Sequence, residues 1–104
     1  MSNIAPFGPD ELEPGDIRQV EIEGRDAIAI YNLDGEYFAT DDTCTHGAAS
    51  LSEGEIEGEE VICPFHLGSF NIRSGEAVVG PCVKAVRTYP GRVEEGMLYV
   101  EIGP

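Results

Sequence analysis

Two short segments hold both histidines of the chain and two of its three cysteines. They are Cys44-Thr45-His46 and Cys63-Pro64-Phe65-His66, with sixteen residues between them. Such short spacings let one tight loop turn two side chains onto a single centre, and two facing loops enclose that centre. Thiolate sulfur and imidazole nitrogen are ligands of both zinc and iron-sulfur sites. We therefore predict a four-ligand metal site made by Cys44, His46, Cys63 and His66.

The distribution of the ligands between the loops bears on the choice of metal. Zinc fingers place cysteines together in one loop and histidines together in another. Here each loop supplies one cysteine and one histidine. A mixed pair in each loop suits a two-iron cluster, in which two histidines replace two cysteines on one iron. A structural zinc module that mediates protein interactions is the alternative, and colour separates the two because zinc is colourless.

The flanking residues strengthen the iron-sulfur interpretation. Residues 44–47 and 63–70 resemble the two cluster-binding boxes of Rieske ferredoxins, in particular the small ferredoxins of bacterial multicomponent aromatic-ring-hydroxylating dioxygenases. Asp34-Gly35, Leu51-Ser52 and Pro81-Cys82 also fall where those ferredoxins have similar residues, so the resemblance covers nearly the whole chain. Leu67 replaces the glycine of many Rieske boxes, and bulky residues also occur there in the dioxygenase ferredoxins.

The resemblance implies one Rieske-type [2Fe-2S] cluster and a carrier function. Cys44 and Cys63 would bind one iron, and His46 and His66 the other. We expect a one-electron carrier, not an enzyme, between a flavin-dependent NAD(P)H reductase and a terminal aromatic-ring-hydroxylating oxygenase. A small Rieske subunit of a larger oxidoreductase such as nitrite reductase is the alternative. Both histidines would mark the docking face, rimmed by Phe65, Leu67 and Pro81.

Differences from the high-potential Rieske proteins of respiratory chains predict a low redox potential. Those relatives carry an extra cysteine in each box, linked as a disulfide, where this chain has Ala49 and Phe65. They also place serine and tyrosine hydroxyls near the sulfurs, where this chain has Gly68 and Phe70. Carboxylates close to the boxes, at Asp41, Asp42 and Glu53, would oppose the addition of an electron. We expect about −150 mV, the low end of the Rieske range.

Composition limits the remaining possibilities. The chain has 104 residues and 41% hydrophobic residues, which suits one compact domain. Six basic and twenty acidic residues give a formal charge of −14, which repels nucleic acid and anionic membranes and favours partners with basic patches. No apolar stretch approaches the roughly 20 residues of a membrane span. Cys82 lies outside the predicted ligand set, which favours a reducing compartment such as the cytoplasm, and nothing requires more than a monomer.

The strand patterns predict an all-β fold without a long helix. By resemblance this is an antiparallel, sandwich- or barrel-like Rieske fold forming a single domain, 1–104, with a cluster-binding subdomain of about residues 41–82 inserted in a basal domain. We expect residues 1–14 to form an arm over a sheet edge, 79–82 to wall the cluster, and Pro90-Gly91 to form a turn. The expected strands are 17–22, 26–31, 36–40, 61–62, 70–72, 83–89 and 97–102.

Overall fold

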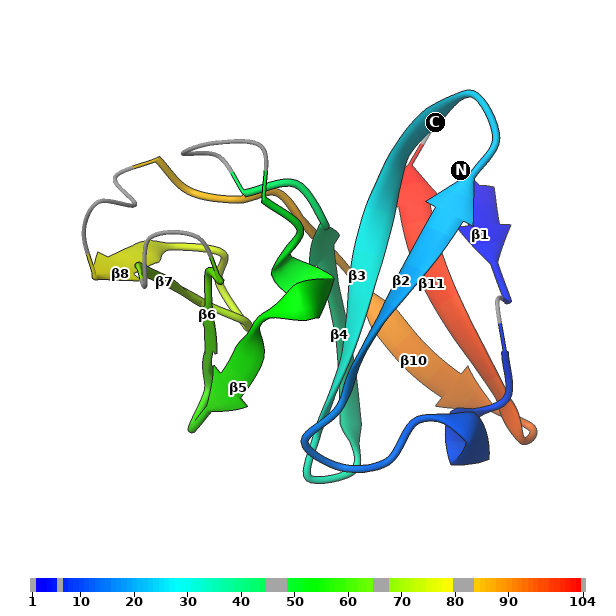
Figure 1. Ribbon diagram of the computed structural model, residues 1–104. Helices are drawn as coiled ribbons and strands as arrows, with labels where there is room; N and C mark the ends of the chain where they lie inside the picture. The colour runs from blue at the N-terminus through cyan, green and yellow to red at the C-terminus, as the bar shows by residue number, and fades with distance from the viewer. Residues whose placement is uncertain (1, 6, 45–48, 65–67, 80–83, 104) are drawn as a thin grey trace.

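The computed structural model describes residues 2–5, 7–44, 49–64, 68–79 and 84–103. These residues form eleven strands, two short 3-10 turns and no α-helix, and none of their helical turns is long or apolar enough to cross a membrane (Figure 1). The prediction of an all-β fold is confirmed. In chain order the elements are β1 (Ser2–Ile4), η1 (Pro9–Glu11), β2 (Ile17–Ile22), β3 (Arg25–Leu33), β4 (Glu36–Asp41), η2 (Leu51–Glu53), β5 (Glu55–Glu57), β6 (Glu60–Ile62), β7 (Ser69–Asn71), β8 (Ala77–Val79), β9 (Thr88–Tyr89), β10 (Gly91–Glu94) and β11 (Met97–Gly103).

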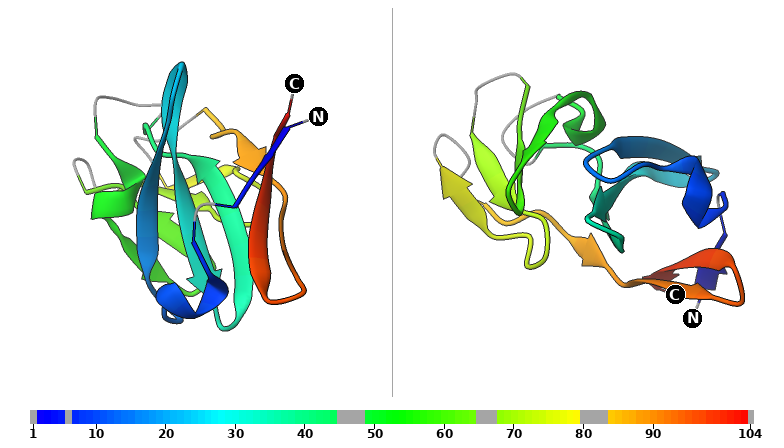
Figure 2. Two further views of the ribbon diagram at one scale, coloured as in Figure 1. Left: turned by 90° about the vertical axis from the view of Figure 1, so that its right-hand side faces the viewer. Right: turned by 90° about the horizontal axis from the view of Figure 1, so that it is seen from below.

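The strands form three antiparallel sheets. Their orders are β2-β3-β4-β9, β1-β11-β10 and β5-β6-β7-β8. The first two sheets face each other and make the basal part of the molecule, whereas the β5–β8 sheet lies to one side (Figures 1 and 2). This third sheet comes between β4 and β9 in the chain, and these two strands pair with each other. The segment that carries both predicted ligand loops therefore leaves and rejoins one sheet at the same place.

Strand β3 belongs to both hydrophobic cores that the described residues form. Ile28 and Ile30 pack into a basal core with Leu98 and Val100 of β11. Ala29, Tyr31 and Leu33 point to the other face, where they pack against residues of the β5–β8 sheet and its ligand loops. Successive side chains of a strand alternate between its two faces. The continuous apolar run in β3 thus reflects burial on both sides of a central strand.

A tight turn closes the hairpin between β3 and β4. Asp34 and Gly35 adopt positive φ angles of 53° and 96°, as a two-residue hairpin turn requires. The side chain of Asn32 supports this turn, because its Oδ1 accepts a hydrogen bond from the Gly35 N–H at 2.7 Å. At the N-terminus, β1 adds to the sheet edge next to β11. The prediction that this arm lies at a sheet edge is confirmed.

Two predictions about the C-terminal part were wrong. Of the described residues 84–89, only Thr88 and Tyr89 form a strand, and Val83 lies outside the described residues. Gly91 does not form a turn; it begins β10, which pairs with β11 through the Glu95-Gly96 turn. Strand β10 lies at the end of its sheet and its residues 92–94 are exposed, so it lacks the alternation of apolar residues by which strands are recognised.

Candidate metal centre

Both predicted cysteine ligands end the paired part of a β-hairpin, and the same hydrogen bond closes each hairpin. The N–H of Cys44 donates to the carbonyl oxygen of Ala49 at 2.9 Å. The N–H of Cys63 donates to the carbonyl oxygen of Gly68 at 2.7 Å. In each case the acceptor lies five residues after the cysteine, so the two hairpins are closed at equivalent positions. The predicted ligands His46 and His66 fall between donor and acceptor in the chain and lie outside the described residues.

Different elements support the two hairpins. The first continues inward from Cys44 through a bridge between Thr43 and Ser50, and its base is closed by the Leu51 N–H, which donates to the Asp42 carbonyl at 2.7 Å. The second continues inward from Cys63 as β6 and β7, with Ile62 opposite Ser69. The two cysteines are therefore held by backbone ladders rather than by irregular loops.

Both cysteine side chains are buried in the same group of packed residues. Cys44 is 2% exposed and Cys63 is 0% exposed. Each belongs to the core that contains Leu51, Val61 and Phe70. A thiolate in apolar surroundings is costly unless a metal compensates its charge. Two buried cysteines in one core fit the sulfur-ligated iron of a two-iron cluster, and they fit zinc equally well.

Of the four predicted ligands, the structure describes Cys44 and Cys63, whereas His46 and His66 lie outside the described residues. Within the described ranges, no three His, Cys, Asp or Glu side chains converge as metal ligands. Phe65, Leu67 and the predicted wall residues Pro81 and Cys82 also lie outside these ranges. Val79, the one described residue of the predicted wall 79–82, ends β8 and is 49% exposed.

The hydroxyl groups of Ser69 and Tyr31 in this region donate hydrogen bonds to other side chains. Ser69 is fully buried and donates to a carboxylate oxygen of Glu60 at 2.7 Å. The Thr40 hydroxyl donates to the Asp41 carbonyl, so the Tyr31 hydroxyl, 2.8 Å from Thr40 Oγ1, is the donor of that pair. Burial raises the pKa of Tyr31 far above its usual range, and its hydrogen bond with Thr40 opposes this rise.

Position 70 is occupied by a buried phenylalanine, whose ring is 0% exposed. This chain thus has Gly68 and Phe70 at the two positions where the high-potential relatives carry hydroxyl donors. Ser69, which lies between these two positions in the chain, also carries a hydroxyl, but it was not singled out from the sequence. Its partner Glu60 lies across the β6–β7 pair, facing Asn71, which sequence spacing alone does not show.

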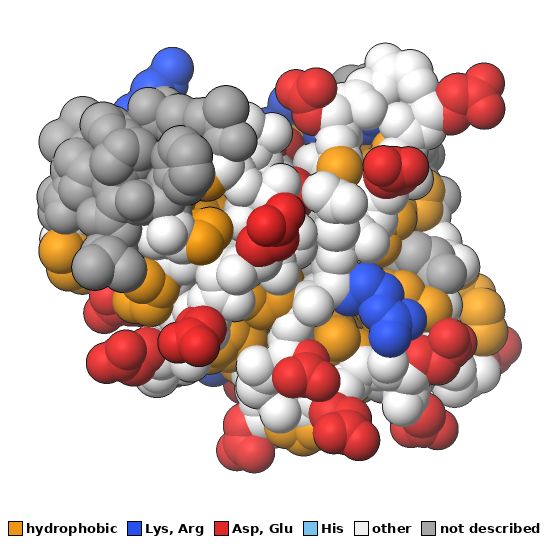
Figure 3. All heavy atoms as spheres, viewed as in Figure 1, with side chains coloured by type: hydrophobic (Ala, Val, Ile, Leu, Met, Phe, Trp, Pro, Cys, Tyr) orange, Lys and Arg blue, Asp and Glu red, His pale blue; other side chains and the backbone are white. Residues whose placement is uncertain are grey.

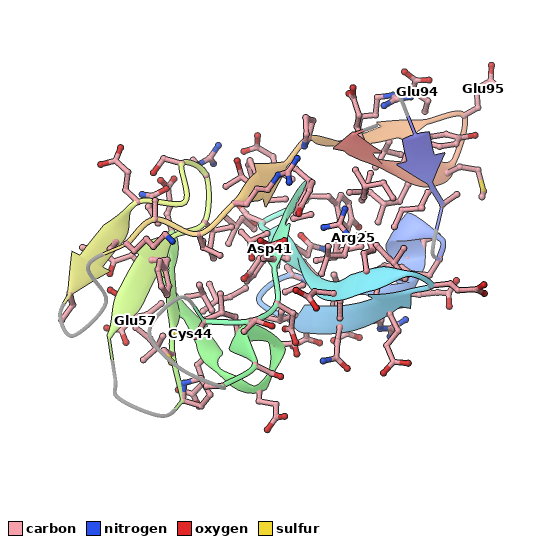
Figure 4. The ribbon with its side chains drawn as sticks, turned by 90° about the horizontal axis from the view of Figure 1, so that it is seen from above. Arg25, Asp41, Cys44, Glu57, Glu94 and Glu95 are labelled. Atoms are coloured by element: carbon pink, nitrogen blue, oxygen red, sulfur yellow. The ribbon has the colours of Figure 1, made fainter. Side chains whose placement is uncertain are left out.

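Three side chains join the two ends of the segment that carries the ligand loops. Tyr89 donates its hydroxyl hydrogen to Asp41 Oδ1 at 2.5 Å, and Arg25 Nη2 donates to the Tyr89 oxygen at 2.5 Å. Arg25 also lies 3.5 Å from the same Asp41 oxygen. Burial, followed by the bond to Asp41, raises the pKa of Tyr89. Figure 4 shows Asp41 near the middle of the molecule, with Cys44 on one side and Arg25 on the other.

The surface is strongly acidic because twenty acidic residues face only six basic ones, and the arginines among these are held against aromatic rings. Each of the five arginines stacks over a phenylalanine or tyrosine ring, with its guanidinium carbon 4.7 to 5.3 Å from the ring centre. Arg73 additionally lies 3.0 Å from Glu36 of β4 and 3.0 Å from Glu59 in the β5–β6 turn. Figure 3 shows acidic side chains spread over the viewed face, with few basic ones.

Comparisons with known proteins agree with this site. Residues 5–90 match the Rieske [2Fe-2S] domain family. The ferredoxin component of the p-cumate 2,3-dioxygenase system of Pseudomonas putida is 46% identical over 95 residues, which cover 90% of this chain and 80% of that protein.

Solved structures give the same result. A chain in the complex of reduced oxygenase and oxidized ferredoxin in carbazole 1,9a-dioxygenase has a TM-score of 0.92 and 38% identity, covering 95% of this chain and 92% of that one. A structure described as an NADH-dependent nitrite reductase small subunit from Mycobacterium tuberculosis has a TM-score of 0.85 at 24% identity, covering 95% and 93%, a likeness of fold alone. The buried cysteine pair, the twin hairpins and these matches lead to one conclusion: the chain belongs to the Rieske [2Fe-2S] domain family and is similar to the ferredoxin components of dioxygenase systems.

Proposed function

We propose that this protein is a one-electron carrier whose Rieske cluster passes electrons from a flavin-dependent NAD(P)H reductase to a terminal aromatic-ring-hydroxylating oxygenase. The observation that carries the proposal is the pair of equivalent hairpins, each presenting one buried cysteine to a common core. The p-cumate relative is a ferredoxin component of such a system, which supports the same role here. The carrier itself activates no oxygen, because both histidines of the chain are assigned to the cluster.

The proposed ligands are those given by the sequence. Cys44 and Cys63 hold one iron and His46 and His66 hold the other, one cluster for each chain. When bound, the cluster supplies a centre that gains and loses one electron. The protein's contribution is to keep both sulfurs in a dry core, because the hairpins that carry them close over Leu51, Val61 and Phe70.

The hydroxyl groups of the core support a low potential. Hydrogen bonds to the sulfurs raise the potential of such clusters. Ser69 and Tyr31 donate their hydrogens to Glu60 and Thr40 instead. A potential near the low end of the Rieske range, about −150 mV, suits a carrier that takes electrons from a flavin.

The charge distribution supports transient binding to partners with basic surfaces. The formal charge is −14, and the arginines Arg25, Arg73 and Arg92 lie within 4 Å of carboxylates of this chain. Long-range attraction of this kind raises association rates and weakens with ionic strength. The carbazole structure is a complex of an oxygenase with its ferredoxin, so the partner proposed here has a counterpart there. The proposed carrier is a monomer in the reducing cytoplasm. Its ligand loops belong to a subdomain of about residues 41–82.

The test is an electron paramagnetic resonance (EPR) spectrum before and after reduction with dithionite, with iron and sulfide measured on the same sample. We expect a signal only after reduction, and two irons and two sulfides for each chain. A colourless protein that contains one zinc would overturn the proposal and assign the same ligands to a structural site. Stable co-purification with a larger reductase would favour the nitrite reductase type of subunit.

A further inference from the structure

Asp42 is a buried carboxylate at the base of the first ligand hairpin. Among the described residues, the buried polar side chains are Asn32, Thr40, Asp42 and Ser69, and Asp42 is the one of these four that carries a carboxylate. It is 2% exposed and stands two residues before Cys44. Burying a carboxylate is costly unless hydrogen bonds or an opposite charge compensate it. A buried aspartate at this position therefore needs compensating interactions.

Asp42 makes four hydrogen bonds, of which two join the hairpin to the basal sheet and two close the base of the hairpin. Its Oδ2 accepts from Gln19 Nε2 of β2 at 2.7 Å, and its Oδ1 accepts from the Ser52 N–H at 2.8 Å. Its own N–H donates to the Ala27 carbonyl of β3 at 3.1 Å, and its carbonyl accepts from the Leu51 N–H at 2.7 Å. One residue thus fixes both the beginning and the end of the first hairpin on two strands.

The side-chain partners of Asp42 leave its charge uncompensated. Gln19 and the Ser52 backbone are both neutral donors. In the part of the chain that the structure describes, the ion pairs involve Asp41, Glu36, Glu59 and Glu94, and none involves Asp42. The neighbouring Asp41 differs in this respect, because Arg25 and Tyr89 both contact it. A buried charge is also screened by salt much less than an exposed one.

We propose that Asp42 is a positioning residue of the metal centre, which fixes the first ligand hairpin on the basal sheet and whose buried charge lowers the midpoint potential. The inference rests on the proposed function, since it needs the cluster to be present. It goes further by assigning part of the low potential to one carboxylate. Such a charge disfavours the extra electron of the reduced form, and low local polarity strengthens the effect.

The variant Asp42→Asn separates the charge from the hydrogen bonds. Asparagine keeps an oxygen for the Ser52 N–H, and its amide group can donate where Oδ2 now accepts. Gln19 then has to present its own oxygen, which requires only a rotation of its amide about the last bond, and this side chain is exposed. Asp42→Ala removes both side-chain bonds. Glu53→Gln is the matched control, because it removes one charge from an exposed residue two positions beyond Leu51.

The readouts are the midpoint potential, by redox titration followed by EPR, and the rate of iron loss to a chelator. In Asp42→Asn we expect iron retention near wild type and a reduced-to-oxidised ratio, at fixed solution potential, raised about tenfold, equivalent to 59 mV for one electron. Glu53→Gln should shift this ratio much less, and Asp42→Ala should lose iron faster than Asp42→Asn. An unchanged ratio in Asp42→Asn, or iron loss in Asp42→Ala no faster than in wild type, would overturn the inference. A wild-type protein without the Rieske signal would instead overturn the proposed function.

Discussion

Gly54 links the two ligand hairpins, and its replacement by alanine should separate them. It ends η2, after the first hairpin, and faces Ile62, which directly precedes Cys63. An added Cβ would lie 2.0 Å from the Ile62 carbonyl oxygen and 3.2 Å from that of Leu51. Real Cβ atoms essentially never approach other atoms closer than 3.0 Å, so the backbones must separate by about 1 Å.

The cost of Gly54→Ala should be purely steric. The φ angle of Gly54 is −86°, which any residue adopts, so no backbone strain is added. Overpacking of this kind costs about 1 to 3 kcal/mol, and we expect about 3 kcal/mol because the obstructing atom is backbone. A loss of that size lowers the Tm of a domain of this length by about 12 to 24 °C. The displaced strand continues into Cys63, so the iron content should fall as well.

Gly58→Ala is the control for this prediction. Gly58 lies in the β5–β6 turn, has a φ of 64° and has nothing within 4 Å of an added Cβ. Alanine at this position adds only the cost of the left-handed conformation, about 1 kcal/mol, and the Gly58→Ala variant should keep its iron. Thermal unfolding and iron analysis of both purified variants make the comparison. Equal Tm losses, or full iron content in Gly54→Ala, would show that the contact with Ile62 does not hold the hairpins together.

Three further predictions concern groups around the same core. Burial raises the pKa of Tyr31 above its unfolded value of 10.0, so the stability that this neutral hydroxyl contributes is complete below pH 10 and is lost as the pH rises further. Urea unfolding from pH 9 to 11 should therefore show a smaller loss of unfolding free energy in Tyr31→Phe than in wild type. Ser69→Ala should cost about 1 kcal/mol and leave the midpoint potential unchanged, since the hydroxyl donates to Glu60; a fall in potential would contradict this. Arg73→Met should lower the Tm in dilute buffer, and the difference from wild type should shrink in 1 M salt because its ion pairs are exposed; a difference independent of salt would assign the loss to packing on Phe38.

A prediction of the site's chemistry was possible because the residue types are rare and closely spaced. Cys44 and Cys63 were predicted as ligands from local spacing, and the structure places both in one core, whereas His46 and His66 lie outside the described residues. Asp42 was noted only for its charge near the first loop, because its partner Gln19 lies 23 residues away in the chain. The contact between Arg25 and Tyr89 spans 64 residues and leaves no local pattern at all.

The fold was predictable where a strand is buried and not where it is exposed. β3 and β11 show apolar residues at the positions that face a core, so their extents were close to those predicted. β10 has one apolar residue, Val93, which is 46% exposed, and it is held by pairing with β11 instead. Backbone pairing leaves little trace in the sequence when neither face of the strand is covered.

Strand β3 supports the part of the molecule that carries the cysteine hairpins. Strands β5 to β8 have three residues each, and sheets of such short strands are marginal unless one face is buried. Val61, Phe70 and Ile72 of this region pack in the same core as Ala29 and Tyr31 of β3. The opposite face of β3 packs into the basal core, so the strand is fixed from both sides. The cysteine hairpins are therefore positioned by the basal sheet, and we expect mutations in β3 to change iron retention even though β3 contributes no ligand.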